Sequence, residues 1–420
     1  MLDRPSSWRW VHVGVAAAAM VATLPGRTHG LGLFTEPIRK TFDLDTETYG
    51  FLNLWATLLG GLFCFPCGWL LDRIGTRAVL VGVTVALGAT VVIMSGATGA
   101  WWLQLDLPGG LSPYLPLDLF VLVLLTRGLG QSALSVASLS LVARSAARRE
   151  GLAMGAYAFL TTVGFIAAFT VLREVIMRDP GEWRGPWAGI GIAVVVAGVL
   201  FLLLVRNRAL DQNPAAPGGD PSATDAGHTL GQALRSPAFW VFALATSFYG
   251  MVVAGTSLFN EKILAERGLS KEVFLNVTIV GIPAGLAANL LGGWIATRWS
   301  LGYLLAAALA LFAGALAVFP RITHEHEAYA YAVALAAAGG VITVTFFTVW
   351  RRAFGTRQLG RIQGAAQFLT VVFSALGPQL FGSTHTRLGS FAPVFPYLAV
   401  TSAALAVAAA VVRLPAKEPE

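Results

Sequence analysis

Long apolar segments recur along the whole chain, and they constrain its fold more than any other feature. Each is close to the roughly 20 residues that a helix needs to cross about 30 Å of hydrocarbon. The segments lie near residues 9–36, 48–71, 77–97, 118–143, 152–174, 186–205, 237–259, 273–297, 302–319, 327–350, 362–383 and 391–412. The composition agrees, because 56% of the residues are apolar and only 12% are charged, too few to coat a surface that faces water. The sequence therefore predicts an all-α membrane protein with twelve transmembrane helices.

Basic residues are distributed unevenly between the two ends of these segments. If the N-terminus is cytoplasmic, 17 of the 29 Lys and Arg residues lie on the cytoplasmic side and ten lie outside. Lys and Arg are retained on the cytoplasmic face during insertion. The excess therefore predicts a multi-pass protein of the cell (inner) membrane with both termini cytoplasmic. It also accounts for the net charge of +7 without a nucleic-acid partner.

One long polar stretch, rich in Pro and Gly, separates the sixth apolar segment from the seventh. It predicts a flexible cytoplasmic linker over residues 206–236, between one six-helix bundle at 1–205 and a second at 237–420. The halves echo each other, since GWLLDR at 68–73 matches GWIATR at 293–298, and GLAMGA at 151–156 matches GRIQGA at 360–365. Internal repeats are typical of carriers whose substrate site lies between the repeats. We therefore expect two pseudo-symmetric bundles.

The stretch GWLLDRIGTR at 68–77 resembles the G-x-L-x-D-R-x-G-x-R loop between helices 2 and 3 of the major facilitator superfamily. With the spans, the linker and the repeat, the resemblance covers nearly the whole chain. It implies the major facilitator fold and transport by alternating access. It also implies that Asp72 faces the N-terminus of helix 11, whose positive dipole end attracts a carboxylate. The implied gating residues are Gly68, Asp72, Arg73, Gly75 and Arg77. The alternative is a basic turn that only sets topology.

Two further stretches resemble the bacterial branch of that family that contains monocarboxylate porters and oxalate/formate exchangers. They are ALRSPAFWVFALATSFYGM at 233–251 and FGTRQLGRIQG at 354–364. Exchangers of that branch carry basic residues inside helices 8 and 11, whereas the corresponding apolar stretches of this chain contain none. This difference argues against a dicarboxylate and leaves a singly charged anion as the expected substrate.

The segment PGRTHG at 25–30 interrupts the first apolar span. Pro25 lacks a backbone donor and the glycines weaken the helix, so backbone polar groups are freed within the membrane. Carriers use such broken helices to coordinate substrate. Arg27 would supply a positive charge and paired N–H donors suited to a carboxylate. His29 would hydrogen-bond the ligand or titrate near neutral pH. The alternatives are an Arg27 paired with a structural carboxylate and a packing role for His29.

The fourth span carries a second arginine within a polar stripe. Arg127, Gln131, Ser135 and Ser138 fall at i, i+4, i+8 and i+11, which places them on one helix face. An arginine at mid-bilayer costs about 2.5–3.5 kcal/mol, so it is expected to face a cavity or a partner. The stretch RGLGQ at 127–131 also resembles the family's helix 4 motif, whose arginine is assigned to substrate binding or coupling. We predict that Arg127, Gln131 and Ser135 bind substrate. The alternative is hydrogen bonding between packed helices.

The resemblance also implies that helices 1, 4, 7 and 10 line the substrate cavity. It adds four candidates to the binding residues: Tyr249 and Ser257 on helix 7, and Thr343 and Phe347 on helix 10.

These features together predict a secondary active transporter of a small organic anion, and within that class of a monocarboxylate, coupled to a proton or a counter-anion. The alternatives are a proton-coupled exporter of apolar or cationic compounds and a non-transporting membrane sensor. The chain has no G-x-x-x-x-G-K-[ST] phosphate loop, which argues against an ATP-driven pump. The stretch THEHE at 323–327 lacks further ligands, so no metal is expected there. We expect no cofactor and no enzymatic activity.

Overall fold

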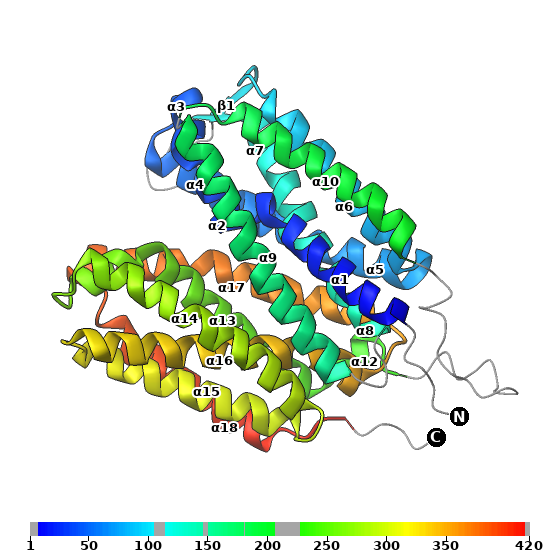
Figure 1. The fold of residues 1–420 in the computed structure, drawn as a ribbon, viewed down its shortest axis with the longest axis vertical. Helices are drawn as coiled ribbons and strands as arrows, with labels where there is room; N and C mark the ends of the chain where they lie inside the picture. The colour runs from blue at the N-terminus through cyan, green and yellow to red at the C-terminus, as the bar shows by residue number, and fades with distance from the viewer. Residues whose placement is uncertain (1–6, 105–113, 146–149, 180, 206–226, 416–420) are drawn as a thin grey trace, which may run out of the picture. The chain divides into compact units, whose positions relative to one another are not determined.

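The computed structural model describes residues 7–104, 114–145, 150–179, 181–205 and 227–415, and helices dominate it (Figure 1). The chain divides into two compact units, each described by itself below. Unit 1 comprises residues 1–141, 160–213 and 363–371, and unit 2 comprises residues 142–159, 214–362 and 372–420. Each unit therefore contains a short piece of the other half of the sequence.

The first half of the chain forms short helices at its start and long ones after them. Its elements are α1 (Ser7–Ala22), η1 (Leu24–Gly26), α2 (Thr28–Gly32), α3 (Thr35–Thr41), α4 (Thr46–Gly61), α5 (Cys64–Ile74), α6 (Thr76–Ser95), β1 (Trp102–Gln104), β2 (Tyr114–Pro116), α7 (Leu117–Thr126), η2 (Arg127–Leu134), α8 (Ser135–Ser145), α9 (Glu150–Arg178) and α10 (Arg184–Leu204). The strands β1 and β2 pair antiparallel, with Trp102 opposite Pro116.

The second half of the chain is built from longer, more regular helices. Its elements are α12 (Leu230–Arg235), α13 (Pro237–Ala265), α14 (Lys271–Ala296), α15 (Leu301–Val318), η4 (Phe319–Arg321), α16 (Glu325–Phe354), α17 (Leu359–Leu388) and α18 (Val394–Val411). The start of α13 follows from its sequence, because the Ser236 side chain caps the helix and Pro237 occupies its first turn.

Eleven helical stretches within the described residues are long and apolar enough to span a membrane. They are Thr48–Ile74, Thr76–Ser95, Leu117–Ser145, Gly151–Ile176, Arg184–Leu204, Pro237–Ala265, Ile279–Ala296, Leu301–Arg321, Glu325–Phe354, Leu359–Leu388 and Val394–Val411. The first of the twelve expected spans differs, since only the shorter stretch Trp10–Gly26 is continuous there. The expected all-α membrane fold is confirmed, and its first helix is interrupted at the PGRTHG segment, as the sequence predicts.

Unit 2 has an aromatic core. Phe319 and Phe395 stack with ring centroids 4.2 Å apart, and Phe381 meets Phe395 edge-on at 5.8 Å. Phe312 is fully buried in the same cluster and meets Phe248 edge-on. Because large rings bury much apolar area in fixed geometry, this cluster holds α13, α15, α17 and α18 together.

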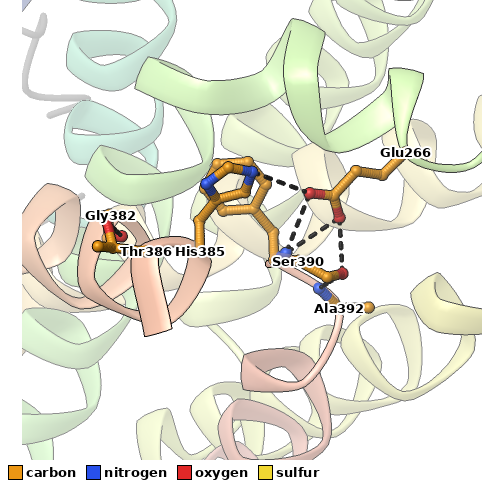
Figure 2. Close-up of polar contacts among 7 residues, drawn as sticks. Glu266, Gly382, His385, Thr386, Ser390 and Ala392 are labelled. Carbon is orange, nitrogen blue, oxygen red and sulfur yellow. Dashed lines mark hydrogen bonds and ion pairs between the residues drawn. The ribbon is translucent and has the colours of Figure 1, made fainter. Parts of the chain in front are cut away.

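A polar cluster in unit 2 ties the end of α13 to the connection between α17 and α18 (Figure 2). The Glu266 carboxylate, just beyond α13, accepts hydrogen bonds from Ser390 Oγ at 2.8 Å and from the Phe391 backbone N–H at 2.9 Å. His385 Nε2 lies 3.6 Å from Glu266 Oε1. The His385 ring also stacks on Phe391, with centroids 4.5 Å apart. One carboxylate thus holds three segments of unit 2 in register.

Most of the predicted linker, residues 206–226, lies outside the described residues. Its last part is ordered against the connection between α16 and α17. The His228 N–H donates to Phe354 O at 2.8 Å, and the Leu230 N–H donates to Gln358 Oε1 at 2.8 Å. A capping box at Thr229 then starts α12. The linker therefore ends in a short helix before α13 begins.

Candidate functional site

The first helix breaks at the segment that contains Arg27. Pro25 lies in η1, where 3₁₀-type bonds from Gly26 N to Thr23 O (2.9 Å) and from Arg27 N to Leu24 O (3.0 Å) replace the α-helical pattern. Arg27 itself is extended, with φ −94° and ψ 151°, and precedes α2. The expected interruption of the helix is therefore present, and it places Arg27 at the junction of two short helical pieces.

The fourth helix is irregular at the level of Arg127. Its residues Arg127–Leu134 form the π-helical segment η2, between α7 and α8. π-helical turns are rare and occur often at functional sites. Within unit 1, Cys67 Sγ of α5 donates to the Ala133 carbonyl at 3.2 Å, and Ser135 Oγ donates to the Gly130 carbonyl at 3.5 Å. These side chains stabilise carbonyls of the irregular segment.

Glycines bring the broken first helix, α4 and η2 into backbone contact. A Cβ atom on Gly26 would lie 2.9 Å from Gly130 Cα, and one on Gly60 would lie 3.0 Å from Gly128 N. Gly26 has no room for a side chain, because a Cβ there would also overlap the Thr126 carbonyl oxygen, and the contact at Gly60 is tight. Small residues at such crossings allow helices to approach closely in lipid. The close approach puts polar groups of three helices within reach of Arg127.

Arg127 is buried, with 3% of its surface exposed, and its described hydrogen-bond partners are all neutral. Nη2 donates to Asn53 Oδ1 at 2.9 Å. Nη1 donates to Thr28 Oγ1 at 3.0 Å, to Gln131 Oε1 at 3.3 Å and to Gly26 O at 3.4 Å. Nε is buried without an acceptor in the described part of the chain. The site therefore holds an arginine whose charge no carboxylate within that part of the chain balances.

Arg27 lies in the same part of unit 1 and is half-buried. Its Nε donates to Thr23 Oγ1 at 2.7 Å, and its Nη2 lies 3.1 Å from Ser135 Oγ and 2.9 Å from Met20 Sδ. Its guanidinium also lies over the Phe165 ring, 5.3 Å from the centroid. Arg27 thus contacts Ser135 and Arg127 contacts Gln131, and these two polar residues are one helical turn apart. The structure brings these four predicted residues together.

Two other predicted positions in this region have different outcomes. The Ser138 hydroxyl donates to Ala16 O at 2.7 Å, so this end of the polar stripe bonds the fourth helix to the first. For Ser138, this contact matches the alternative role of hydrogen bonding between packed helices. His29 lies on α2, and its side chain falls outside the described residues.

The candidates of the second half lie in unit 2. Tyr249 of α13 is half-buried, and its hydroxyl contacts Gly339 of α16 at a point where no side chain would fit. Thr343 and Phe347 follow Gly339 at four-residue spacing, so all three share one face of α16. Both side chains are half-buried, whereas Ser257 is exposed on α13. Tyr249 therefore contacts the face of α16 that carries Thr343 and Phe347, at Gly339.

The predicted gating loop joins α5 to α6 in unit 1. Gly75 has φ +90°, a conformation that side chains other than glycine rarely adopt. Arg77 Nη2 donates to Leu202 O, at the C-terminal end of α10, at 2.6 Å. Arg73 stacks on the Trp69 ring at 4.8 Å. Gly68 is buried, and Asp72 is half-buried and has a polar partner. The contact of Asp72 with the start of helix 11 stays a prediction.

Two cavities lie elsewhere in the units, and both are lined largely by apolar side chains. One of about 290 Å³ in unit 1 is lined by Phe51, Trp55, Leu59, Leu103, Leu115, Leu117 and Phe120. The other, of about 480 Å³ in unit 2, is lined mainly by residues of α13, α17 and α18. Neither includes Arg27 or Arg127 in its lining. Their composition does not suit an anion.

Sequence reasoning missed the groups that surround Arg127. Asn53 is the main one, since its amide also donates to Tyr49 O at 3.1 Å, which orients its oxygen toward Arg127. A signal was present, because Tyr49, Asn53 and Thr57 recur every four residues and form a polar stripe in the second span. Thr28, which follows Arg27 in the sequence, is the other, since its hydroxyl accepts from Arg127 Nη1 at 3.0 Å.

Comparisons with known proteins agree on the fold. A family model described as Major Facilitator Superfamily matches residues 13–378. The solved structure of the proton:xylose symporter XylE bound to 6-bromo-6-deoxy-D-glucose is similar, with a TM-score of 0.70 and 14% identity over 96% of this chain and 95% of that one. FucP in its outward conformation has a TM-score of 0.62 and 15% identity over 95% of this chain and 97% of that one. No curated protein matches. At these identities the solved structures show the shared fold alone.

Proposed function

Since the chain belongs to the major facilitator superfamily, whose members are transporters, we propose that it moves a small organic anion across the membrane by alternating access. Within that class we propose a monocarboxylate, in line with the likeness to the monocarboxylate porter branch.

The observation that carries this proposal is the state of Arg127. A guanidinium in the membrane is costly unless it has a partner, and the described partners of Arg127 are two amides, a hydroxyl and a carbonyl. Neutral acceptors solvate the charge but do not balance it. Nε has no acceptor among the residues described, and it lies on the same edge as Nη2. That edge matches the two oxygens of a carboxylate.

Arg27 supports the same substrate class. It reaches Ser135, four residues beyond the Gln131 that contacts Arg127, so both cations lie along one face of the fourth helix. The Phe165 ring under Arg27 offers an apolar surface to the short carbon chain of an acid. We propose that Arg127 binds the carboxylate, that Arg27 adds long-range attraction, and that Gln131 and Ser135 complete the polar side of the site.

Burial of Arg127 requires that the site opens to admit substrate. Alternating access provides this step, and the loop at residues 68–77 is proposed to gate it through Gly68, Asp72, Arg73, Gly75 and Arg77. Tyr249, Ser257, Thr343 and Phe347 are proposed as the contribution of the second half, and His29 as a further polar group. We propose that both termini are cytoplasmic. Uptake of a lone anion against a negative interior would cost about 2.3 kcal/mol per 100 mV. Concentrative uptake therefore needs a coupled proton or an exchanged anion.

A thermal-shift panel on the purified protein tests the substrate class. The ligands are lactate and similar short acids, a lipophilic cation, and xylose, because one similar structure is that of a xylose symporter. We expect the acids to raise the melting temperature of the wild type and to lose this effect in Arg127→Ala. Arg39→Ala is the matched control, since Arg39 pairs with Glu36 away from the site. Acid stabilisation that persists undiminished in Arg127→Ala would remove Arg127 from the binding role.

The same panel and a flux assay separate the alternatives. Stabilisation by the lipophilic cation alone would favour the exporter, and stabilisation by xylose alone would favour a sugar carrier. A sensor would give proteoliposome flux no higher than that of empty vesicles for every compound. Acid flux that requires Arg127 is the result expected here.

A further inference from the structure

The two sequence echoes GWLLDR and GWIATR hold the same side-chain arrangement. In unit 1, the Arg73 guanidinium lies over the Trp69 ring, 4.8 Å from its centroid. In unit 2, the Arg298 guanidinium lies over the Trp294 ring, 4.3 Å from its centroid. In both cases the arginine follows the tryptophan by four residues, which places the two side chains on one face. The halves share only short stretches of sequence, so the recurrence of this stack is informative.

Both stacks lie at the end of a membrane span. Trp69 is near the end of the span Thr48–Ile74, and Trp294 is near the end of the span Ile279–Ala296. The indoles are 40% and 48% exposed, respectively, and both arginines are exposed. Tryptophan is enriched at the depth of the lipid headgroups, where its ring contacts apolar chains and its N–H contacts water. An arginine over such a ring holds its charge at the same depth.

The guanidinium edges of both stacks remain available. Stacking uses only the flat face of the group, and neither Arg73 nor Arg298 has a carboxylate or carbonyl partner among the residues that the structure describes. Neighbouring arginines differ. Arg77 donates to Leu202 O, and Arg352 donates to Ala296 O at the end of α14. Because Arg352 already donates a hydrogen bond to the Ala296 carbonyl, Arg298 is not needed to cap the C-terminus of α14. Arg298 is exposed just beyond the end of the span Ile279–Ala296, which is the depth expected for lipid phosphates.

We propose that each Trp–Arg stack binds the phosphodiester headgroup of an anionic membrane lipid, at one site per unit. The guanidinium pairs two N–H donors with two phosphate oxygens, and the indole packs against the glycerol and the upper acyl chain. This proposal does not depend on the transported substrate. Trp69 and Arg73 lie within the predicted gating loop, whereas Trp294 is distant in sequence from it, so the second site gives the cleaner test.

Native mass spectrometry of the full chain, purified with phosphatidylglycerol or with phosphatidylcholine, tests the proposal. We expect two tightly retained phosphatidylglycerol molecules on the wild type, one on Trp294→Ala, and one on Trp69→Ala. Arg298→Ala should weaken the second site about fivefold, the effect of one basic residue near an anionic surface. Arg298→Lys should retain part of that affinity. If Trp294→Ala is not stable, Trp294→Phe keeps an aromatic face and is expected to keep the lipid.

Trp299→Ala is the matched control, because Trp299 is a neighbouring tryptophan, 61% exposed, on which none of the described arginines stacks. It should retain both lipids. Equal loss in Trp299→Ala and Trp294→Ala would overturn the proposal, as would unchanged retention in both Trp294→Ala and Arg298→Ala. Soluble glycerol phosphate is added as a competitor, to distinguish a lipid site from a site for free phosphate. If it displaces the lipid at equal concentration, the site recognises free phosphate and the lipid proposal is wrong.

Discussion

At the scale of single residues, the unusual feature of this protein is a buried arginine surrounded by neutral oxygens. Asn53, Thr28 and Gln131 hold the Arg127 guanidinium in place without cancelling its charge. A carboxylate in any of these positions would neutralise the site permanently. Neutral partners instead keep the cation oriented and leave its attraction for a soluble anion intact.

Replacing Asn53 by aspartate tests this interpretation. Asn53 Oδ1 is 2.9 Å from Arg127 Nη2, so Asn53→Asp would form an internal ion pair at the same distance. We expect the apparent affinity for the acid to fall at least about tenfold, because the new carboxylate competes with the ligand for Arg127. A tenfold loss corresponds to an interaction of more than about 1.4 kcal/mol between this carboxylate and the buried guanidinium. Titration of the thermal shift against acid concentration measures it.

Asn53→Ala distinguishes competition by a new carboxylate for Arg127 from loss of the hydrogen bond that orients Arg127. It removes one neutral partner of Arg127 without adding a charge, so we expect a smaller loss of acid affinity than in Asn53→Asp. The melting temperature of ligand-free Asn53→Asp should stay close to that of the wild type. Wild-type acid affinity in Asn53→Asp would show that Arg127 does not hold the ligand.

At the scale of elements, the site depends on two irregular helices that meet through glycine. The first helix breaks at η1, the fourth contains the π-helical segment η2, and Gly26 faces Gly130 where they cross. Both irregularities free or redirect backbone groups in the membrane, where water cannot satisfy them. Gly26 O, for example, accepts from Arg127 Nη1 at 3.4 Å. The crossing therefore couples the helix geometry to the position of the cation.

Gly26→Ala tests the need for this crossing. The new methyl group would overlap the Thr126 carbonyl and approach Gly130 Cα at 2.9 Å. We expect destabilisation of about 1–3 kcal/mol, typical of overpacking, together with reduced acid binding. Gly32→Ala is the matched control, since nothing lies within 4 Å of the added atom and its helix α2 belongs to the same broken segment. Equal melting temperatures for the two variants would contradict the argument.

At the scale of the whole molecule, transport requires exchange between two states, and the loop at 68–77 is the proposed control point. Gly75 at φ +90° forms the sharp turn between α5 and α6, and Arg77 anchors the start of α6 to the end of α10. Arg77 thus ties the start of α6 to α10 within unit 1. We propose that this connection transmits the movement of one helix to the next.

Asp72→Asn is the test at this scale. Asp72 has a polar partner, and loss of its charge weakens that interaction while conserving the shape of the side chain. If the loop gates, acid flux in proteoliposomes should fall about tenfold or more at saturating substrate, with KM little changed, because an interaction of 1–3 kcal/mol between states is lost. Acid binding by thermal shift should be retained. A raised KM at wild-type flux would place Asp72 in substrate binding instead.

Much of the fold and part of the site are readable from the sequence. The span positions and the start of α13 at Ser236–Pro237 follow from local patterns of apolar, capping and ring-constrained residues. The break at Pro25 follows in the same way. The proximity of Arg127 to Asn53 does not, because these residues are separated by 74 positions and their pairing depends on how the second and fourth helices pack. The π-helical segment η2 also had no local signature beyond Gly128 and Gly130.

The sequence alone determined that this chain spans the membrane many times in two related halves, because the thickness and apolarity of the bilayer constrain each segment independently of the others. It also determined the family motif and the presence of two arginines within apolar spans. Only the tertiary structure decided that glycines pack the broken first helix against η2, and that Arg127 lies among neutral oxygens. Those features depend on contacts between residues far apart in the chain, which a local pattern of hydrophobicity does not encode.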